Sequence, residues 1–415
     1  MPAREQGMAI RHGRIPVWGE LSKPQPLIPS LRFGALTMRV LVVKTSSLGD
    51  VIHALPAVTD AARALPGIRF DWVVEEAFAE IPGWHPAVER VIPVALRRWR
   101  RHPFARATRE EWRAFRAALA SVRYDCMLDA QGLLKSAWLA SKAHGPLHGL
   151  DRRSAREPLA SLAYTHRHAI PWGLHAVRRV RELFAAALGY ALPPEARDDT
   201  DGAASADAAA YGLDRARALA DAPATASDDP PRLVCLHGTT WPAKHWPEPY
   251  WRELARLASA AGWQIRLPWG NDAEHARAAR IAAGLDGARV LPRLTLGGLA
   301  AELTAATACV AVDTGLGHLA AAFDIPALSL FGPTHPGFTG AWGCRQQRLA
   351  TDFPCAPCLK KNCPRHAGES PEAGIEPPCF TRLPPPRIWQ WVSEAGKTAI
   401  PPQGGFIAGS PILDS

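Results

Sequence analysis

The stretch Met38-Arg-Val-Leu-Val-Val-Lys-Thr-Ser-Ser-Leu-Gly-Asp-Val-Ile-His-Ala-Leu-Pro56 decides the fold class of this 415-residue chain. Its near-continuous apolar run, residues 39–44, is typical of a strand that is buried on both faces of a parallel sheet. A turn of small residues follows, and then a helical pattern over residues 51–65, in which Asp50 is placed as the N-cap. Pro56 has no backbone N–H, so we expect a kink or a short first turn in this helix. The stretch predicts the strand–turn–helix unit that begins an α/β domain.

The rest of the chain repeats this alternation in two series. The first predicts strands at residues 69–74, 90–94 and 124–129, with helices at 110–120, 133–142 and 175–188. The second predicts strands at residues 232–237, 264–268, 289–291, 308–312 and 327–330, with helices at 249–261, 273–283, 296–305 and 317–323. Alternating strands and helices favour a parallel, doubly wound sheet. The predicted fold class is α/β, with two Rossmann-like domains that face a central cleft.

The domain boundaries follow from composition. We expect a disordered extension at 1–37, an N-terminal domain at 38–195 and a linker, rich in Ala, Asp and Pro, at 196–231. The C-terminal domain then covers 232–398 and includes a Cys-rich insertion at 352–380, before a disordered tail at 399–415.

Composition excludes several classes of protein. The chain is 47% hydrophobic and 21% charged, and no run of about 20 apolar residues predicts a transmembrane helix. The first residues lack the apolar core of a secretory signal, and eight cysteines do not make a disulfide scaffold at this length. We therefore expect a soluble protein of the cytosol.

The net charge of +9 is concentrated in the first half of the chain, where residues 38–195 carry 23 basic and 15 acidic side chains. Nine arginines lie there among only two glutamates, Glu110 and Glu111; they are Arg97, Arg98, Arg100, Arg101, Arg106, Arg109, Arg113, Arg116 and Arg123. Such a surface attracts nucleic acid, phosphorylated lipid or an anionic membrane face. A solvated helix face is the alternative.

Polar residues follow three of the predicted strands, where open α/β sheets bind their ligands. Asp50, beside the hydroxyls of Ser46 and Ser47, has the chemistry of a general base for an incoming hydroxyl, although an aspartate at a helix start is commonly structural. The segment Asp313-Thr-Gly-Leu-Gly-His318 is expected to begin a helix at a glycine, and such a helix start suits a diphosphate ligand. The alternative is a simple strand–turn–helix connection in which Asp313 caps the helix.

The third segment runs from Leu236 to Pro247. Thr239 and Thr240 supply hydroxyl donors there, and Lys244 supplies a point charge suited to phosphate. The second and third segments together predict a pocket for an anionic, diphosphate-like ligand in the C-terminal domain, with Asp50 across the cleft.

These motifs identify a family. The stretch from Met38 to Pro56 resembles the start of the ADP-heptose family of GT-B glycosyltransferases, the lipopolysaccharide heptosyltransferases. The resemblance extends in order to Gly340 through Phe70–Glu76, Glu89–Val94, Leu128–Leu133, Ala155–Ser161, Lys244–Pro247, Leu267–Gly270 and Val312–Leu319.

The resemblance implies an inverting, metal-independent enzyme at the cytoplasmic face of the inner membrane. It would transfer L-glycero-D-manno-heptose from ADP-heptose to the first Kdo of Kdo2-lipid A, through an α-1,5 linkage, and would touch the anionic leaflet peripherally. The alternative within the family is heptosyltransferase II, or another ADP-heptose transferase with a different core acceptor. No cofactor and no nucleic acid are implied.

The resemblance also implies a role for each matching residue. Asp50 matches the catalytic base, Lys244 the lysine on the donor phosphate with Thr239 and Thr240 beside it, and Glu274 the carboxylate on the adenosine ribose. Asp313 matches the residue near the heptose hydroxyls. The remaining donor positions are Thr314, Gly315, Leu316 and His318 around the diphosphate; the acceptor positions are Ser46, Ser47, Arg97, Arg98, Arg100 and Arg156.

A cysteine cluster departs from this pattern. Cys355, Cys358, Cys363 and Cys379 have a spacing that fits four thiolate ligands of a structural zinc ion, outside the catalytic site. A disulfide pair and unpaired thiols on a loop are the alternatives. Two readings of the whole chain also stay open: a nucleic-acid-binding module, which leaves Asp313 and Lys244 without a role, and an inactive nucleotide-sugar binder, against which Asp50 argues.

Overall fold

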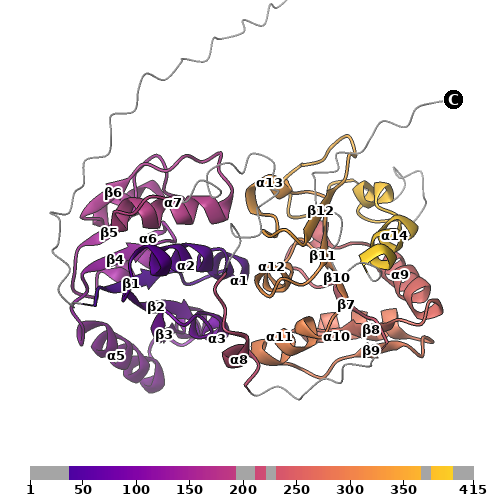
Figure 1. Cartoon of the computed structure of the whole chain (residues 1–415), viewed down its shortest axis with the longest axis horizontal. Coiled ribbons are helices and arrows are strands. Elements are labelled where there is room, and N and C mark those ends of the chain that lie inside the picture. The colour runs from indigo at the N-terminus through magenta and orange to yellow at the C-terminus, as the bar shows by residue number, and fades with distance from the viewer. Residues whose placement is uncertain (1–36, 193–210, 221–229, 366–374, 396–415) are drawn as a thin grey trace, which may run out of the picture. The chain divides into compact units, whose positions relative to one another are not determined.

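The computed structural model describes residues 37–192, 211–220, 230–365 and 375–395 (Figure 1). It contains two six-stranded sheets, and every strand pair in them is parallel. We call the part that carries the first sheet, residues 37–192, the first lobe, and the part that carries the second sheet, residues 230–365 and 375–395, the second lobe. The predicted α/β class with two doubly wound, Rossmann-like units is confirmed.

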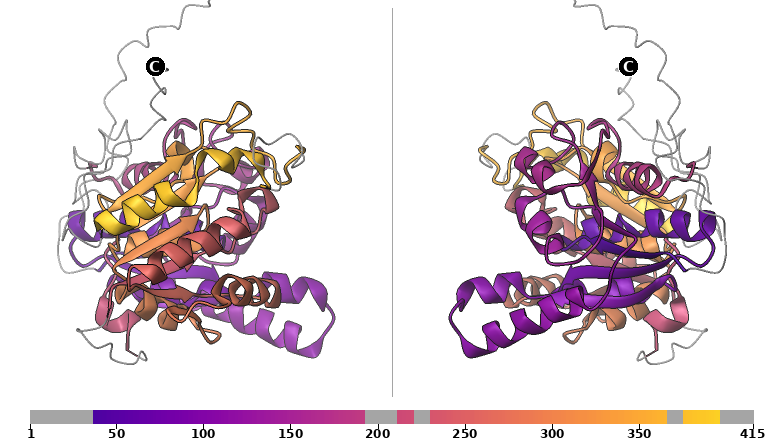
Figure 2. Two further views of the ribbon diagram at one scale, coloured as in Figure 1. Left: turned by 90° about the vertical axis from the view of Figure 1, so that its right-hand side faces the viewer. Right: turned by 90° about the vertical axis from the view of Figure 1, so that its left-hand side faces the viewer.

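The first sheet has the strand order β3-β2-β1-β4-β5-β6. Its elements are β1 (Arg39–Val43), α1 (Leu48–Ile52), α2 (Leu55–Ala64), β2 (Arg69–Glu75), η1 (Glu76–Phe78), α3 (Glu80–Gly83), β3 (Val88–Val94), α4 (Leu96–Arg101), α5 (Arg106–Ala120), β4 (Cys126–Asp129), α6 (Leu134–Ala140), β5 (Leu147–Leu150), η2 (Pro158–Ala163), β6 (His166–His168) and α7 (Ala176–Leu188). Helices α4 and α5 form a hairpin that extends away from the sheet (Figure 2).

The second sheet has the order β12-β11-β10-β7-β8-β9. After α8 (Arg215–Ala218), its elements are β7 (Arg232–Leu236), η4 (Pro242–Lys244), α9 (Glu248–Ala260), β8 (Gln264–Leu267), α10 (Asp272–Ala282), β9 (Ala288–Val290), α11 (Leu296–Thr304), β10 (Ala308–Val312), α12 (Gly315–Ala322), β11 (Ala327–Phe331), α13 (Pro336–Thr339), β12 (Gln346–Ala350), η6 (Pro378–Arg382) and α14 (Pro385–Ala395). Helix α14 packs against α9 and β10.

Both sheets reverse their strand order at one place, because their first and fourth strands are neighbours. These pairs are β1 with β4 and β7 with β10. In open α/β sheets, such a switch point leaves room for a ligand beyond the carboxyl ends of the two strands. A ligand is therefore expected at the loops that follow these four strands.

Some local predictions are wrong. The helix expected over 51–65 is two helices, and Pro56 stands at the start of the second one, where its missing N–H costs nothing. Three strands were not predicted: β5, β6 and β12. Polar residues interrupt their apolar pattern, as in the His-Arg-His of β6 and the Gln-Gln-Arg of β12, so they lack the continuous run that marks a central strand.

The two lobes meet where α1 packs against α12. We call this contact the junction. One hydrophobic cluster also runs from the first lobe into the second, through residues such as Trp84 and Phe323, whose ring centroids lie 5.8 Å apart. The helix after β1 and the helix after β10 thus bring the two switch points together.

Several domain predictions fall outside the described residues. The extension at 1–37 does so except for Thr37, as do the tail at 399–415 and most of the linker at 196–231, of which residues 211–220 and 230–231 are described. Part of the Cys-rich insertion, residues 366–374, is also not described. Among the helices of the described residues, none is long and apolar enough to cross a membrane.

Candidate active site

The loop after β1 is held in place by the segment after β4. The side-chain oxygen of Gln131 accepts a hydrogen bond from the Thr45 N–H at 2.9 Å, and its amide group donates one to the carbonyl of Ser46. The Lys44 ammonium donates a hydrogen bond to the Ala130 carbonyl at 2.8 Å. At the first switch point, three hydrogen bonds thus join the turn after β1 to the segment after β4.

Asp50 lies in this turn, in the first turn of α1 and not at its N-cap. The N-cap is Ser47, whose N–H and hydroxyl donate to Asp50 Oδ2 at 2.8 and 2.9 Å. The prediction of Asp50 as the N-cap was wrong by three residues, because the Ser-x-x-Asp spacing forms a capping box. The Asp50 side chain keeps 39% of its surface exposed, so its second oxygen can meet a ligand.

The protonation state of Asp50 suits a base. Burial acts to raise the pKa of its carboxyl, but the charge of Lys44 and the two hydrogen bonds from Ser47 outweigh it, and the pKa is lowered. The Lys44 ammonium lies 4.0 Å from Asp50 Oδ1. A carboxylate that stays ionised at neutral pH and is half open to solvent is able to accept a proton.

The second switch point pairs a lysine with an aspartate. The Lys244 ammonium, at the end of η4, lies 2.6 Å from Asp313 Oδ2 and 4.6 Å from the centre of the Trp241 ring. Asp313 follows β10, and its carboxylate also accepts a hydrogen bond from the Thr334 hydroxyl at 2.7 Å. The Thr239 hydroxyl donates to the Asp313 carbonyl at 3.1 Å. Three predicted donor-site residues therefore meet at one place, where a cation is fixed beside a helix start.

Glu274 lies at the edge of the same switch point. It stands in the first turn of α10 and accepts a hydrogen bond from the Gly270 N–H at 2.8 Å. A Cβ atom on Gly238, which follows β7, would lie only 2.8 Å from the Glu274 carboxyl group. The carboxylate thus spans the loops after β7 and β8, while Thr240 is exposed on the first of these loops.

The predicted Thr-Gly-Leu-Gly-His segment begins α12. Thr314 is the N-cap, and Gly315 and Leu316 form the first turn. Gly315 is required there, since a Cβ atom would lie 2.8 Å from Leu48 Cβ in the first lobe. Backbone N–H groups at a helix start attract anions. A helix thus opens at a glycine in this segment, and diphosphate binding by it stays a prediction.

His318 joins the two lobes at the junction. Its Nδ1 lies 3.1 Å from Nε2 of His53, and its ring covers Gly49, where a Cβ atom would lie 2.7 Å from Cδ2. Burial lowers the pKa of His318, while the charges of Asp313 and Asp50 act to raise it and that of Lys244 to lower it. His318 is thus within electrostatic reach of the proposed base and of both charged residues of the donor side.

The predicted acceptor arginines have different surroundings. Arg98 forms ion pairs with Glu76 and Glu111 at 2.9 Å each, so its guanidinium is already engaged. Arg97 and Arg100 are exposed on the same helix, α4. Arg156 is exposed just before η2 and contributes to lowering the pKa of Asp50. Ser46 accepts a hydrogen bond from the Lys135 ammonium at 3.4 Å.

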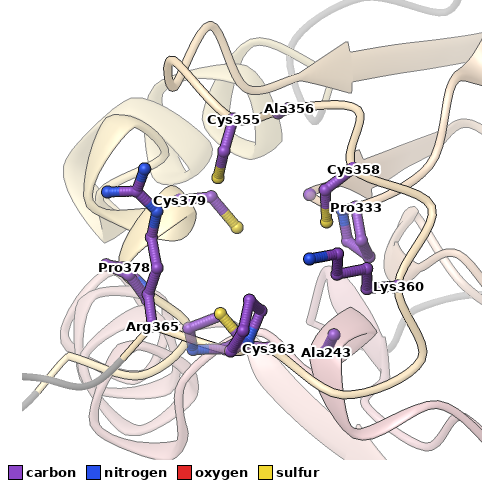
Figure 3. Close-up of a pocket in the computed structure, with 13 residues that line it drawn as sticks. Ala243, Pro333, Cys355, Ala356, Cys358, Lys360, Cys363, Arg365, Pro378 and Cys379 are labelled. Carbon is purple, nitrogen blue, oxygen red and sulfur yellow. The ribbon is translucent and has the colours of Figure 1, made fainter.

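The four predicted zinc ligands line one cavity (Figure 3); they are Cys355, Cys358, Cys363 and Cys379. Burial raises the pKa of the Cys379 thiol, and the other three thiols add to this effect. No three or more His, Cys, Asp or Glu side chains are arranged to hold a metal ion in the described part of the chain. Figure 3 shows the four side chains directed toward this cavity, so the thiols gather as their spacing predicted, and zinc binding there stays a prediction.

Sequence reasoning missed three residues of the site. Lys44 directly follows the apolar residues of β1, and only its charge at the strand end signals a role. Gln131 and Thr334 also gave no signal, because their partners, at Ser46 and Asp313, are distant in sequence. The sequence pattern also assigns no role to His53, whereas the structure shows its hydrogen bond to His318.

The arrangement places an ionised carboxylate on one side of the junction and a fixed cation with a helix start on the other. Two Rossmann-like lobes with such a division define a glycosyltransferase of the GT-B type. The chain belongs to glycosyltransferase family 9, the heptosyltransferases, whose family model matches residues 112–367.

The relatives agree with this assignment. Lipopolysaccharide heptosyltransferase 1 of Pseudomonas aeruginosa is 60% identical over 357 residues, which is 85% of this chain and 96% of that protein. The solved structure of Escherichia coli heptosyltransferase WaaC with ADP has a TM-score of 0.72 and 45% identity, and the match covers 86% of this chain and 100% of that one. The same enzyme with ADP-2-deoxy-2-fluoro heptose matches at a TM-score of 0.70 and 44% identity, over 86% of this chain and 99% of that one.

Proposed function

We propose that this glycosyltransferase moves L-glycero-D-manno-heptose from ADP-heptose to the first Kdo of Kdo2-lipid A, as the first heptose of the lipopolysaccharide core. The relative with 60% identity carries the name lipopolysaccharide heptosyltransferase 1, and a solved relative holds an ADP-heptose analogue. The observation that carries the mechanism is the half-exposed Asp50 carboxylate, whose pKa is lowered beside Lys44.

In this proposal Asp50 is the general base. Its free oxygen takes the proton of the Kdo hydroxyl. The oxygen of that Kdo hydroxyl, and not Asp50, forms the new bond to the anomeric carbon of the heptose, on the face opposite the diphosphate. The bond from the anomeric carbon to the diphosphate oxygen breaks, and ADP leaves with the electron pair. One displacement inverts the configuration at the anomeric carbon, so no second carboxylate is needed as a nucleophile.

The departing charge is met by Lys244 and by the start of α12. In this structure the Lys244 ammonium lies 2.6 Å from the Asp313 carboxylate. We propose that the donor diphosphate binds Lys244 either together with Asp313 or in its place. Fixed donors of this kind stabilise developing charge without a divalent cation. We propose metal-independent transfer on this basis, with Glu274 on the ribose, Asp313 and the Thr239 and Thr240 hydroxyls on the donor side, and Thr314, Gly315, Leu316 and His318 around the diphosphate.

On the acceptor side, we propose that Ser46, Ser47 and the basic residues of the first lobe face the sugar acids and phosphates of the lipid. Arg97, Arg100 and Arg156 are exposed in the structure, whereas Arg98 would have to leave Glu76 or Glu111. Because the acceptor is an anionic membrane lipid, the proposal places the enzyme peripherally on the cytoplasmic leaflet of the inner membrane.

Incubation of the full chain with ADP-heptose and Kdo2-lipid A, followed by mass spectrometry, tests the proposal. One added heptose is expected, before and after dialysis against EDTA. A parallel reaction with an acceptor that already carries the first heptose tests the alternative of heptosyltransferase II. Transfer to that acceptor alone would contradict the proposed acceptor, and activity lost with EDTA and restored by magnesium would contradict metal independence.

A further inference from the structure

Exposed apolar side chains gather on one part of the first lobe. Of the eight large hydrophobic side chains that are exposed in the described residues, six belong to this lobe. Four of the six lie on two elements, α6 and η2: Leu134 is 49% exposed, Trp138 49%, Leu159 59% and Leu162 70%. We call these four residues the α6–η2 ridge.

The ridge residues point outward in pairs. Leu134 and Trp138 are four residues apart on an α-helix, and Leu159 and Leu162 are three apart on a 3-10 helix, so each pair lies on one face of its element. The two elements pack against each other, and the N–H of Leu134 donates to the Glu157 carboxylate at 2.7 Å, immediately before η2. The two outward pairs therefore belong to neighbouring elements.

The ridge is a fixed surface. The Trp138 ring stacks on Trp112 of α5, with centroids 4.8 Å apart and an interplanar angle of 1°. Trp112 in turn packs against Trp99 of α4 and Phe115 of α5, which are both buried. About half of the Trp138 surface remains exposed to solvent, although one face of its ring stacks on Trp112. A scattered surface leucine needs no explanation, but a supported group of four with an aromatic member marks an interaction surface.

The surroundings of the ridge are strongly basic. Residues 97–157 contain 14 Lys or Arg and 6 Asp or Glu. The Lys142 ammonium lies 5.1 Å from the centre of the Trp138 ring, Lys135 is exposed between the two α6 ridge residues, and Arg156 is exposed at the entry to η2. Apolar and aromatic side chains within a cationic surface match the interface of an anionic bilayer, where the rings reach the acyl boundary and the cations meet the headgroups.

The ridge also lies close to the base. Lys135, which stands between Leu134 and Ser136 on α6, donates from its ammonium to the Ser46 hydroxyl in the loop that leads to Asp50. A glycolipid acceptor must present its sugar to Asp50 while its acyl chains stay in the bilayer, so a membrane contact beside this loop shortens the path between them.

We propose that the α6–η2 ridge docks this enzyme on the surface of an anionic phospholipid bilayer. The inference deepens the proposed function, because it supplies the surface through which the enzyme reaches a membrane-held acceptor. The docking itself requires neither donor nor acceptor, so it is tested separately.

The test is flotation of the full chain with phosphatidylcholine vesicles that do or do not contain phosphatidylglycerol. The wild type is expected to float with the anionic vesicles and far less with pure phosphatidylcholine, and high salt is expected to weaken its binding. The double variant Leu159→Ser/Leu162→Ser should bind the anionic vesicles about tenfold more weakly, since two leucines no longer enter the interface.

A matched control comes from the second lobe, where Phe338 is 53% and Leu359 is 64% exposed. The control variant Phe338→Ser/Leu359→Ser should float like the wild type. Unchanged flotation of the ridge variant, equal loss in the control variant, or a wild type that binds no vesicles would each overturn the proposal.

Transfer assays separate this proposal from the proposed function. The ridge variant should lose transfer to Kdo2-lipid A held in vesicles and keep transfer to a soluble, deacylated form of that acceptor. A wild type that floats but transfers no heptose to either acceptor would contradict the proposed function and leave the docking surface supported. Equal transfer by the ridge variant and the wild type in vesicles would count against the ridge.

Discussion

The imidazole Nε2 of His53 lies 3.1 Å from Nδ1 of His318, although the two residues are 265 positions apart and belong to different lobes. Burial lowers the pKa of both rings, so both are neutral at neutral pH and one of them donates its proton to the other. His53 follows the helix that carries Asp50, and His318 lies on the helix that begins with Thr314-Gly315. This hydrogen bond therefore connects the base with the proposed diphosphate loop.

Replacement of His53 by Phe should lower kcat for heptose transfer about tenfold, because His318 loses its partner in a buried place. The KM for ADP-heptose should change less than kcat, since His53 lies in the first lobe and the proposed donor residues lie in the second. Steady-state kinetics measures both. His148→Phe is the matched control, because His148 is also hydrogen-bonded to a histidine, His168, but at the far edge of the first sheet. Full activity of the His53 variant would show that the bond has no positioning role.

Gly49→Ala should reduce transfer about tenfold or more, because the new methyl group would lie 2.7 Å from the His318 ring and push the junction apart. The control is Gly173→Ala, since a Cβ atom at Gly173 meets nothing within 4 Å. Kinetics and thermal denaturation of both variants provide the check. Equal activity in the two variants would mean that the close contact of α1 with α12 is not required.

The pH dependence of transfer should depend on Lys44. Burial tends to raise the pKa of Asp50, and the Lys44 charge is the largest of the influences that lower it. In Lys44→Met that influence is lost, so the pKa of Asp50 rises and the acid limb of the pH–rate profile moves to higher pH. The profile of kcat between acid and neutral pH measures this. An acid limb that stays in place, or moves to lower pH, would contradict the pairing.

Folding stability should fall on acidification through His175. Its Nδ1 accepts a hydrogen bond from the Val177 N–H, and its Nε2 donates to the Gly340 carbonyl, an arrangement that only the neutral ring can make. Burial lowers the pKa of His175 from 6.5 to about 3. Its stabilising contribution is therefore complete above pH 6.5 and is lost progressively as the pH falls toward 3.

This loss amounts to about 2 kcal/mol between pH 7.5 and pH 5. Urea unfolding at the two pH values measures it, and His175→Asn, which cannot become charged, should lack that part of the pH dependence. A variant that loses as much stability on acidification as the wild type would refute the assignment.

Much of the architecture was predictable, since central strands such as β1 and β10 are continuous apolar runs. Pro56 was expected to kink one helix, whereas it stands at the start of a second one. Strands β5, β6 and β12 were not predicted, because polar residues interrupt their apolar patterns. Ser-x-x-Asp at residues 47–50 could have been recognised as a capping box, which would have placed Asp50 correctly.

The contacts between the two lobes could not be predicted from the sequence. The pairing of His53 with His318 and the packing of Leu48 against Gly315 leave no local signal, because each depends on how two sheets meet. Within the first lobe, the ion pairs of Arg98 with Glu76 and Glu111 depend on where α4 lies relative to η1 and α5. Residue types at strand ends predicted which side chains gather, but not which of them are already partnered.

The most direct test of the account is Asp50→Asn, measured for transfer and for donor affinity on the same preparation. The amide oxygen can still accept from Ser47, so the capping box survives while the base is lost. The account predicts that transfer to Kdo2-lipid A falls by a factor of about 100 or more. It also predicts that the Kd for ADP, measured by calorimetry, stays close to that of the wild type. Transfer at the wild-type rate, or a loss of ADP binding as large as the loss of transfer, would contradict it.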